Sequence, residues 1–236
     1  MTTANAVRVH NGTLVNSIVH GDCIQVMCQL PAQSVDLILT DPPYLVNFRD
    51  RAGRSIPNDR DDSWLKPAFT EAFRILKTNR FMICFYGWSR IDSFLQAWRE
   101  AGFHPVGHLV FAKDYASRTT FLRYQHEQAF LLAKGHPNAP AAPISDVREF
   151  RYSRNKLHPT QKPVSSLIPL IESFSRTGDL VADPFCGSAS TCAAALLTGR
   201  HFIGIELDEA YHRIAVDRMA RIRNRIAAQR LLPKRE

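Results

Sequence analysis

Residues 35–44 of the chain read VDLILTDPPY. The first six form a short run of mostly apolar side chains, which predicts a buried strand of a parallel sheet. The two prolines cannot continue that strand, because each lacks a backbone N–H and has a fixed φ. The sequence therefore predicts a buried strand that ends in a rigid turn, and this turn presents an acid, Asp41, and an aromatic side chain, Tyr44.

The rest of the chain alternates similar apolar runs with amphipathic stretches, as expected for a parallel sheet connected by helices. Further strands are predicted at residues 17–20, 81–86, 104–112, 127–133, 180–182 and 202–206, and helices around residues 65–76, 91–98 and 211–226. Two segments interrupt this alternation. Residues 45–62 are polar and predict a mobile loop, whereas residues 136–163 hold five of the 14 prolines and predict a connector. The length of 236 residues predicts a single domain, 1–236.

The composition narrows the class of protein. Thirty lysine and arginine residues against 22 aspartate and glutamate residues give a formal net charge of +8, which favours a polyanionic partner. With 45% hydrophobic and 22% charged residues, a mostly disordered or collagen-like chain is excluded. No apolar run is long enough for a membrane span and the first residues lack a signal-peptide core, so we expect a cytoplasmic protein without a membrane partner. The five cysteines form no C-x-x-C pair, and no metal site is expected.

The D-P-P-Y turn has a chemistry of its own. Its prolines offer carbonyls that can only accept hydrogen bonds, and Asp41 adds an acceptor carboxylate. Such a site suits the exocyclic amine of adenine or cytosine, whose lone pair is delocalised into the ring until both amine hydrogens are bound. Tyr44 can stack on the face of the base. The plain alternative is a strand that ends in a proline turn beside a surface tyrosine.

A second motif, DPFCGSAST at residues 183–191, predicts a strand, a turn and the start of a helix. Gly187 lets a ligand approach the backbone, and Glu206, 19 residues further on, ends the next predicted strand. In nucleotide-binding α/β units, an acid at about this distance binds the ribose hydroxyls. Ala189 and Cys192 replace the later glycines of G-x-G-x-x-G, which argues against NAD. S-adenosylmethionine, which has ribose and adenine but no pyrophosphate, fits better; the alternative is a tight turn without a ligand.

A third motif, HPTQKP, occupies residues 158–163. In this order the three motifs resemble those of the beta-class amino-group DNA methyltransferases, and the resemblance covers about residues 19–220. It implies an α/β, Rossmann-like class I methyltransferase fold, circularly permuted so that the catalytic motif precedes the cofactor motif. The implied sheet has seven mostly parallel strands in the order 3-2-1-4-5-7-6, with one reversed strand. A bacterial, phage or plasmid origin is implied as well.

The resemblance also assigns site residues. Catalytic roles fall to Asp41, Pro42, Pro43 and Tyr44. Cofactor contacts fall to Asp22, Lys162, Asp183, Pro184, Phe185, Gly187, Ser188 and Glu206. The cofactor would be S-adenosyl-L-methionine and the product S-adenosyl-L-homocysteine, with direct methyl transfer and no metal. The chain departs from the family pattern at Ala189, where a second glycine is usual, and this departure is expected to bear on cofactor binding.

The implied partner is double-stranded DNA, from which the target base flips into the pocket beside Tyr44. Seven arginines are expected to contact DNA: Arg49, Arg51, Arg54, Arg118, Arg123, Arg151 and Arg154. By elimination, residues 113–157 are expected to carry target recognition and to read a short site. Relatives of this class often dimerise, so a homodimer is expected on the resemblance alone.

The expected reaction is methyl transfer to the 6-amino group of adenine, because Asp at position 41 is the family's usual adenine form. The enzyme would act within a restriction–modification pair or as an orphan. Methylation of the 4-amino group of cytosine, or of RNA, stays open. So does a nucleic-acid-binding protein that has lost catalysis, with Ala189 as its first lesion. Methylation of a protein glutamine is disfavoured by Asp rather than Asn at position 41.

Overall fold

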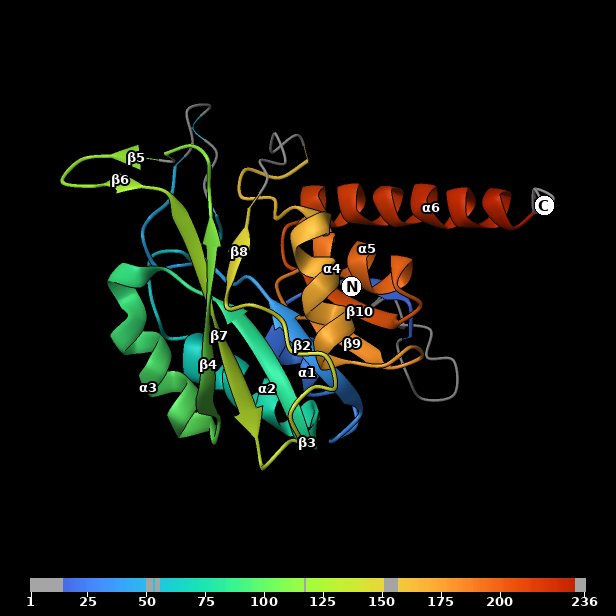
Figure 1. The fold of residues 1–236 in the computed structure, drawn as a ribbon, viewed down its shortest axis with the longest axis horizontal. Coiled ribbons are helices and arrows are strands. Elements are labelled where there is room, and N and C mark those ends of the chain that lie inside the picture. Colours follow the sequence, from blue (N-terminus) through green and yellow to red (C-terminus); the bar gives the residue numbers. More distant parts are fainter. Residues whose placement is uncertain (1–14, 50–52, 54–55, 117, 151–156, 232–236) are drawn as a thin grey trace, which may run out of the picture.

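The computed structural model describes residues 15–49, 53, 56–116, 118–150 and 157–231. Its centre is an eight-stranded sheet in the order β1-β10-β9-β2-β3-β7-β4-β8 (Figure 1). In that order the strands span Ser17–His20, His201–Glu206, Leu180–Asp183, Val35–Thr40, Leu76–Phe85, His126–Lys134, His104–Ala112 and Val147–Glu149. Only β7 runs against its neighbours, so the predicted mostly parallel sheet with one reversed strand is confirmed.

The expected number of seven strands is wrong by one. The first seven strands follow the order 3-2-1-4-5-7-6 that the resemblance implied, and β8 is added beyond them at the edge. This strand has three residues, lies in the proline-rich connector and pairs with the β4 segment Val110–Ala112. Periodicity could not reveal it, because a three-residue edge strand has almost no pattern and depends on its neighbour for pairing.

Helices cover both faces of the sheet, and the alternation of side chains along the strands supplies both cores. The helices α1 (Cys23–Met27), α2 (Leu65–Ile75) and α3 (Ile91–Ala101) pack on one face, where Ile38 and Met82 point. The helices α4 (Val164–Phe174), α5 (Ser190–Leu197) and α6 (Glu209–Leu231) pack on the other, where Leu37 and Ile83 point. Burial of β2 from both sides explains why its sequence is a continuous apolar run rather than an alternating one.

Two features project from this body (Figure 1). One is the hairpin of β5 (Arg118–Thr119) and β6 (Arg123–Tyr124), inserted between β4 and β7. The other is the C-terminal part of α6, which extends past the sheet. Within the described residues, no helix is long and apolar enough to cross a membrane, and no cluster of three or more potential metal ligands occurs.

Candidate active site

The turns after β2 and β9 lie side by side, because these strands are parallel neighbours, with Leu37 opposite Val181. Both turns therefore emerge at the carboxyl edge of the sheet, where open α/β sheets bind ligands. A direct hydrogen bond joins the strand ends: the Thr40 hydroxyl donates to Asp183 Oδ1 at 2.8 Å. The two motifs, 142 residues apart in the chain (183 − 41), thus form one site.

Asp41 is held by two donors at its carboxylate. Oδ1 accepts from the Tyr44 hydroxyl at 2.7 Å, and Oδ2 accepts from Lys162 Nζ at 2.6 Å. Lys162 Nζ also lies 3.2 Å from the Tyr44 hydroxyl oxygen, so the three groups form a closed triangle. Burial raises the pKa of the Tyr44 phenol, and the Asp41 charge raises this pKa further, so Tyr44 is a donor at neutral pH.

Lys162 does not stand alone. Its ammonium lies 3.9 Å from Glu127 Oε2, and Glu127 in turn binds Lys113 through its other oxygen. Burial disfavours the charge on Lys162, but Asp41 and Glu127 more than offset this and raise its pKa. Burial likewise disfavours the Glu127 charge, and the two lysines reverse the effect and lower its pKa. The result is a row of alternating charges, Lys113, Glu127, Lys162 and Asp41, leading to the turn.

Sequence reasoning missed Lys113 and Glu127 and placed Lys162 with the cofactor. Glu127 stands near the start of β7, and because β7 is reversed, this start lies at the carboxyl edge of the parallel strands. A single acid ahead of the apolar residues of β7 could have drawn attention to Glu127. The direction of β7 cannot be predicted from these residues, and it is this direction that brings Glu127 to the site. Lys162 contacts Asp41 and is not among the residues that line the pocket.

Tyr44 is seated by a glycine that sequence reasoning also missed. Gly87 follows β3, and a Cβ on it would lie 2.8 Å from Tyr44 Cβ and 3.1 Å from the Tyr44 carbonyl oxygen. No side chain fits there without moving the Tyr44 backbone. Pro42 and Pro43 are buried, so the turn is fixed by its own rings and by Gly87 together.

A pocket opens between the two turns. It is lined by all four residues of the D-P-P-Y motif and by five residues for which cofactor contacts were predicted, Asp22, Pro184, Phe185, Gly187 and Glu206. Glu206 Oε2 accepts from the Gly187 N–H at 2.8 Å, and Oε1 accepts from the Asp208 N–H at 2.8 Å. Burial raises the pKa of Glu206, and these N–H groups oppose the rise. The acid predicted from its spacing thus meets the glycine turn directly.

Other parts of the pocket wall come from distant segments. The Asp22 Oδ1 caps α1 by accepting from the Ile24 and Gln25 N–H groups. Phe185 packs against Trp64, with ring centroids 5.1 Å apart. His158 and Tyr211, whose rings meet edge to face at 4.3 Å, complete the wall beside Gly187. His158 was part of the quoted third motif, but no role was predicted for it or for Tyr211.

Asp183 and Ser188 lie behind the pocket wall rather than in it. Asp183 is 3% exposed and accepts from Thr40 and from the Phe185 N–H at 3.2 Å. Burial raises its pKa to about 7, although its hydrogen bonds oppose the rise. Ser188 is buried, and its carbonyl accepts from Arg218 on α6 at 2.7 Å. In the structure both hold the turn in place, and their predicted contact with the cofactor stays a prediction.

Ala189 has a left-handed backbone, with φ of 63° and ψ of 42°, directly before α5. Glycine adopts this conformation without strain, whereas alanine does so at a cost. The position where the chain departs from the family pattern is therefore one where a glycine has a structural reason.

The loop after the D-P-P-Y turn is anchored by hydrogen bonds in its described part. Asp59, only 2% exposed, accepts from the Val46 N–H at 3.2 Å and the Phe48 N–H at 2.5 Å. Trp64 Nε1 donates to the Asn58 carbonyl. Through these bonds the loop forms part of the pocket wall.

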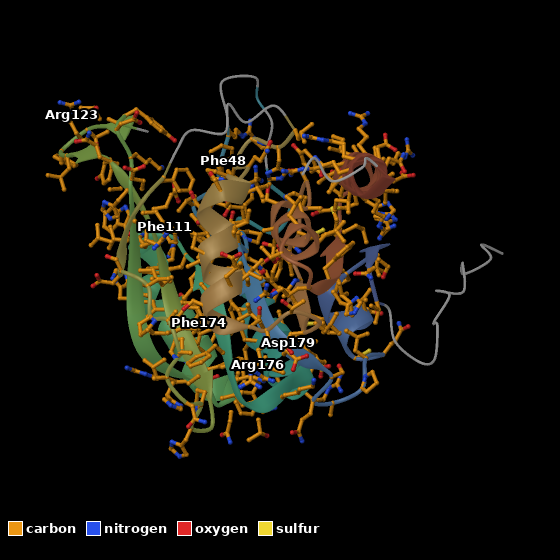
Figure 2. The ribbon with its side chains drawn as sticks, turned by 45° about the vertical axis from the view of Figure 1, so that its right-hand side comes forward. Phe48, Phe111, Arg123, Phe174, Arg176 and Asp179 are labelled. Carbon is orange, nitrogen blue, oxygen red and sulfur yellow. The ribbon has the colours of Figure 1, made fainter. Side chains whose placement is uncertain are left out.

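The predicted DNA-contacting arginines are only partly described. Arg49 and Arg123 are exposed, and Figure 2 shows Arg123 on the outer hairpin, on the same side of the molecule as Phe48. Arg51, Arg54, Arg151 and Arg154 lie outside the described residues, and Arg118 is described only in its backbone. Their predicted contacts stay predictions.

Comparison with known proteins adds the following. The sequence matches the model of the N6_N4_Mtase family, described as DNA methylase, over residues 35–217. Over 208 residues it is 53% identical to YubD of Escherichia coli (strain K12), which is named as a methylase; the match covers 88% of this chain and 92% of YubD. Over 250 residues it is 30% identical to the DNA adenine methyltransferase YhdJ of the same strain, covering 88% of this chain and 84% of YhdJ.

The fold is similar to that of a solved structure of TTHA0409 from Thermus thermophilus, named as a DNA modification methylase, in complex with S-adenosyl-L-methionine. The TM-score is 0.70 at 21% identity, and the match covers 88% of this chain and 94% of TTHA0409. At this identity the likeness concerns the fold.

Proposed function

The chain belongs to the N6_N4_Mtase family of DNA methylases, and from that premise we propose that it transfers the methyl group of S-adenosylmethionine to the 6-amino group of adenine in double-stranded DNA. The observation that carries the proposal is a single pocket lined by Asp41 and Pro42 at one end and by Glu206 at the other. An acceptor site for an amine and an acceptor site for a ribose are thereby held in one cavity.

The cofactor end fits S-adenosylmethionine. Glu206 Oε2 accepts from the Gly187 N–H and Oε1 from the Asp208 N–H, and a carboxylate has further lone pairs that can accept from the ribose hydroxyls. Gly187 has a φ of 50° and no side chain, so a ligand can approach its backbone. Asp22, Phe185 and Glu206 would hold the cofactor, which supplies an electrophilic methyl group when bound. TTHA0409, which has the same fold, binds this molecule.

The catalytic end fits a planar amine. Asp41 and the Pro42 carbonyl can each accept one amine hydrogen, which draws the nitrogen towards tetrahedral geometry and frees its lone pair. Burial raises the pKa of Asp41, and the adjacent Lys162 ammonium opposes this rise by favouring the ionised carboxyl, whose two oxygens are both acceptors. The Tyr44 ring offers a stacking face. Asp41 acts here by hydrogen bonding and charge, because the amine becomes acidic only after it has gained the methyl group.

A base must leave the duplex to reach Asp41, at a cost of a few kcal/mol. Tyr44 also lines an open groove whose wall includes Tyr86, Trp88, Tyr124 and His126. Tyr44 lines both cavities, so a base entering through the groove arrives beside the catalytic turn. We propose this groove as the route of the flipped base, and the basic arginines and residues 113–157 as the parts that contact DNA around it. Dimerisation stays a prediction of the resemblance.

Adenine is proposed over cytosine on two grounds. The motif begins with Asp, and the relative YhdJ, 30% identical, is named as a DNA adenine methyltransferase. The family name covers both N6 and N4 amines, so the 4-amino group of cytosine is the alternative to be tested.

The test is transfer of labelled methyl groups from S-adenosylmethionine to DNA, RNA and protein in parallel, with the products resolved by nucleoside mass spectrometry. We expect N6-methyladenine in DNA. Recovery of 4-methylcytosine would show that the target base is cytosine. Absence of methyl transfer to DNA, RNA and protein alike would reject the proposed methyltransferase activity.

Two variants separate the ends of the pocket. Asp41→Ala should reduce transfer at least roughly 100-fold and still bind the cofactor, because it removes a charged hydrogen bond at the reacting amine. Glu206→Ala should weaken cofactor binding by calorimetry roughly 10- to 100-fold, the range of a charged hydrogen bond. Equal effects of both variants on cofactor affinity would contradict the division of roles.

A further inference from the structure

The hairpin of β5 and β6 carries at its tip the two most exposed large apolar side chains of the described part of the chain. Phe121 is 98% exposed and Leu122 is 67% exposed. The hairpin is ordered by strand pairing between Arg118 and Tyr124, and the Thr120 N–H donates to the Leu122 carbonyl at 3.1 Å. Figure 1 shows it projecting from the end of β4 and β7 away from the sheet. The hairpin therefore holds the exposed apolar side chains of Phe121 and Leu122 at its tip.

The base of the hairpin is fixed beside the groove next to Tyr44. Tyr124 of β6 stacks on Trp88, with centroids 6.0 Å apart and an interplanar angle of 15°. Both rings line the groove that Tyr44 also lines, as does His126, where β7 begins. The apolar tip thus rises from the rim of the cavity that leads to the catalytic turn.

The surroundings of the tip indicate its partner. Arg123 directly follows Leu122 and its side chain is exposed, and Arg118 lies on the other strand of the hairpin, opposite Tyr124. An apolar patch of two side chains is far smaller than the roughly 800 Å² that each partner buries in a stable protein interface. Apolar side chains flanked by arginines suit DNA instead, because the apolar groups can enter between base pairs while the guanidinium groups bind phosphates.

We propose that Phe121 and Leu122 form a wedge that enters the DNA duplex next to the target base and occupies the space this base leaves when it flips. The wedge would stabilise the open duplex by stacking Phe121 on a neighbouring base, while the flipped base enters the groove towards Tyr44. This inference rests on the proposed function, because it concerns how duplex DNA is opened for the same site.

The first test compares methyl transfer to intact duplex DNA with transfer to the same DNA after heat denaturation. The variant is Phe121→Ala with Leu122→Ala, on an exposed loop. We expect duplex transfer to fall roughly 10- to 100-fold, the equivalent of one base stacked on an aromatic side chain, with transfer to single strands unchanged. The matched control, Leu197→Ala with Val216→Ala, removes two other exposed apolar side chains, which are 50% and 42% exposed, and should alter neither. An equal loss on both substrates would overturn the wedge.

The second test uses binding alone, so it does not depend on catalysis. Fluorescence anisotropy compares a fully paired 20-mer with the same duplex carrying one abasic site, which offers a ready-made gap. The parent should prefer the gapped duplex at least several-fold, and the double variant should lose this preference. No preference in the parent would reject the wedge, even if methyl transfer is observed. A preference without any methyl transfer would instead reject the proposed reaction and keep the wedge.

Light scattering must show the same oligomeric state for parent and variant. A change in oligomeric state on substitution would make the tip a contact between copies of the chain and overturn the proposal.

Discussion

Asp41 and Asp183 stand in similar local sequences: Asp41 directly follows β2, Asp183 is the last residue of β9, and each acid precedes a proline. Their surroundings differ. Asp41 faces the pocket and lies 2.6 Å from the Lys162 ammonium. Asp183 is buried behind the residues that line the pocket, and its described hydrogen-bond partners are hydroxyl and N–H donors without a full charge.

This difference in surroundings changes what opposes the effect of burial on the pKa of each acid. Burial raises the pKa of both carboxyl groups, but at Asp41 the Lys162 charge is the main opposing cause. At Asp183 the main opposing causes are neutral hydroxyl and N–H donors, and the pKa reaches about 7. One acid-proline turn thus places its carboxyl beside a full positive charge, whereas the carboxyl of its neighbour has a pKa of about 7 and joins two strands.

The largest expected effect comes from making Asp41 resemble Asp183. Lys162→Met keeps an apolar stem and removes the charge, so Asp41 and Glu127 lose their shared cation. Unfolding free energy should fall by about 3–5 kcal/mol, as for a broken buried ion pair. Because the pKa of Asp41 then rises further, the acid limb of the methyl-transfer pH profile should move to higher pH. Chemical denaturation and a pH–rate profile measure the two effects.

A matched control is Lys66→Met, which breaks an ion pair with Glu100 that lies on the surface, where the lysine side chain is 66% exposed. Neither stability nor the pH profile should change measurably. If Lys162→Met changes neither the unfolding free energy nor the pH profile, the ion pair with Lys162 does not control the pKa of Asp41.

The second prediction concerns Asp183→Asn, which retains the acceptor oxygen for Thr40 and Phe185. In the parent, the unfolded carboxyl loses its proton near the ordinary aspartate pKa, whereas the folded one keeps it until about pH 7. Stability contributed by the protonated group is therefore present at low pH and is lost as pH rises from about 4 to 7. The variant should match the parent near pH 4 and exceed it by up to roughly 4 kcal/mol above pH 7, at 1.36 kcal/mol per pKa unit.

Denaturant unfolding at several pH values decides this prediction, and Asp36→Asn is its control. Asp36 is a buried acid on β2 as well, but it pairs with Lys77 at 2.7 Å and Arg80 at 3.1 Å. Its amide variant should lose stability at neutral pH. A stability difference between Asp183→Asn and the parent that does not vary with pH would show that Asp183 is ionised in the folded protein.

The smallest effect is expected at the turn that Asp183 begins. Ala189→Gly relieves about 1–2 kcal/mol of left-handed strain, but it costs about 0.8 kcal/mol of methyl burial and about 0.5–1 kcal/mol of chain entropy. The net change in unfolding free energy should stay within about 1 kcal/mol, with cofactor affinity by calorimetry near that of the parent. A gain in affinity of tenfold or more would show that the alanine weakens the cofactor turn.

The motifs and apolar runs allowed most of the site to be predicted. The run in β2, the rigid D-P-P-Y turn and the acid 19 residues past Gly187 are properties of local chemistry and spacing, and the structure brings Asp41, Gly187 and Glu206 to one pocket. Fixed φ values, missing N–H groups and period-two burial act within a few residues, so they can be read along the chain.

Only the tertiary structure decided which charges meet. Three segments supply the charged residues Lys113, Glu127 and Lys162, of which Lys162 contacts Asp41 directly. Their meeting depends on the antiparallel direction of β7 and on the position of the residues before α4, and neither leaves a local pattern in the sequence. The ionisation of Asp183 likewise depends on the tertiary structure. Its local sequence resembles that of Asp41, but its pKa of about 7 results from its burial behind the pocket. Burial and the distance between charges govern ionisation, and both are properties of packing between elements that are far apart in the chain.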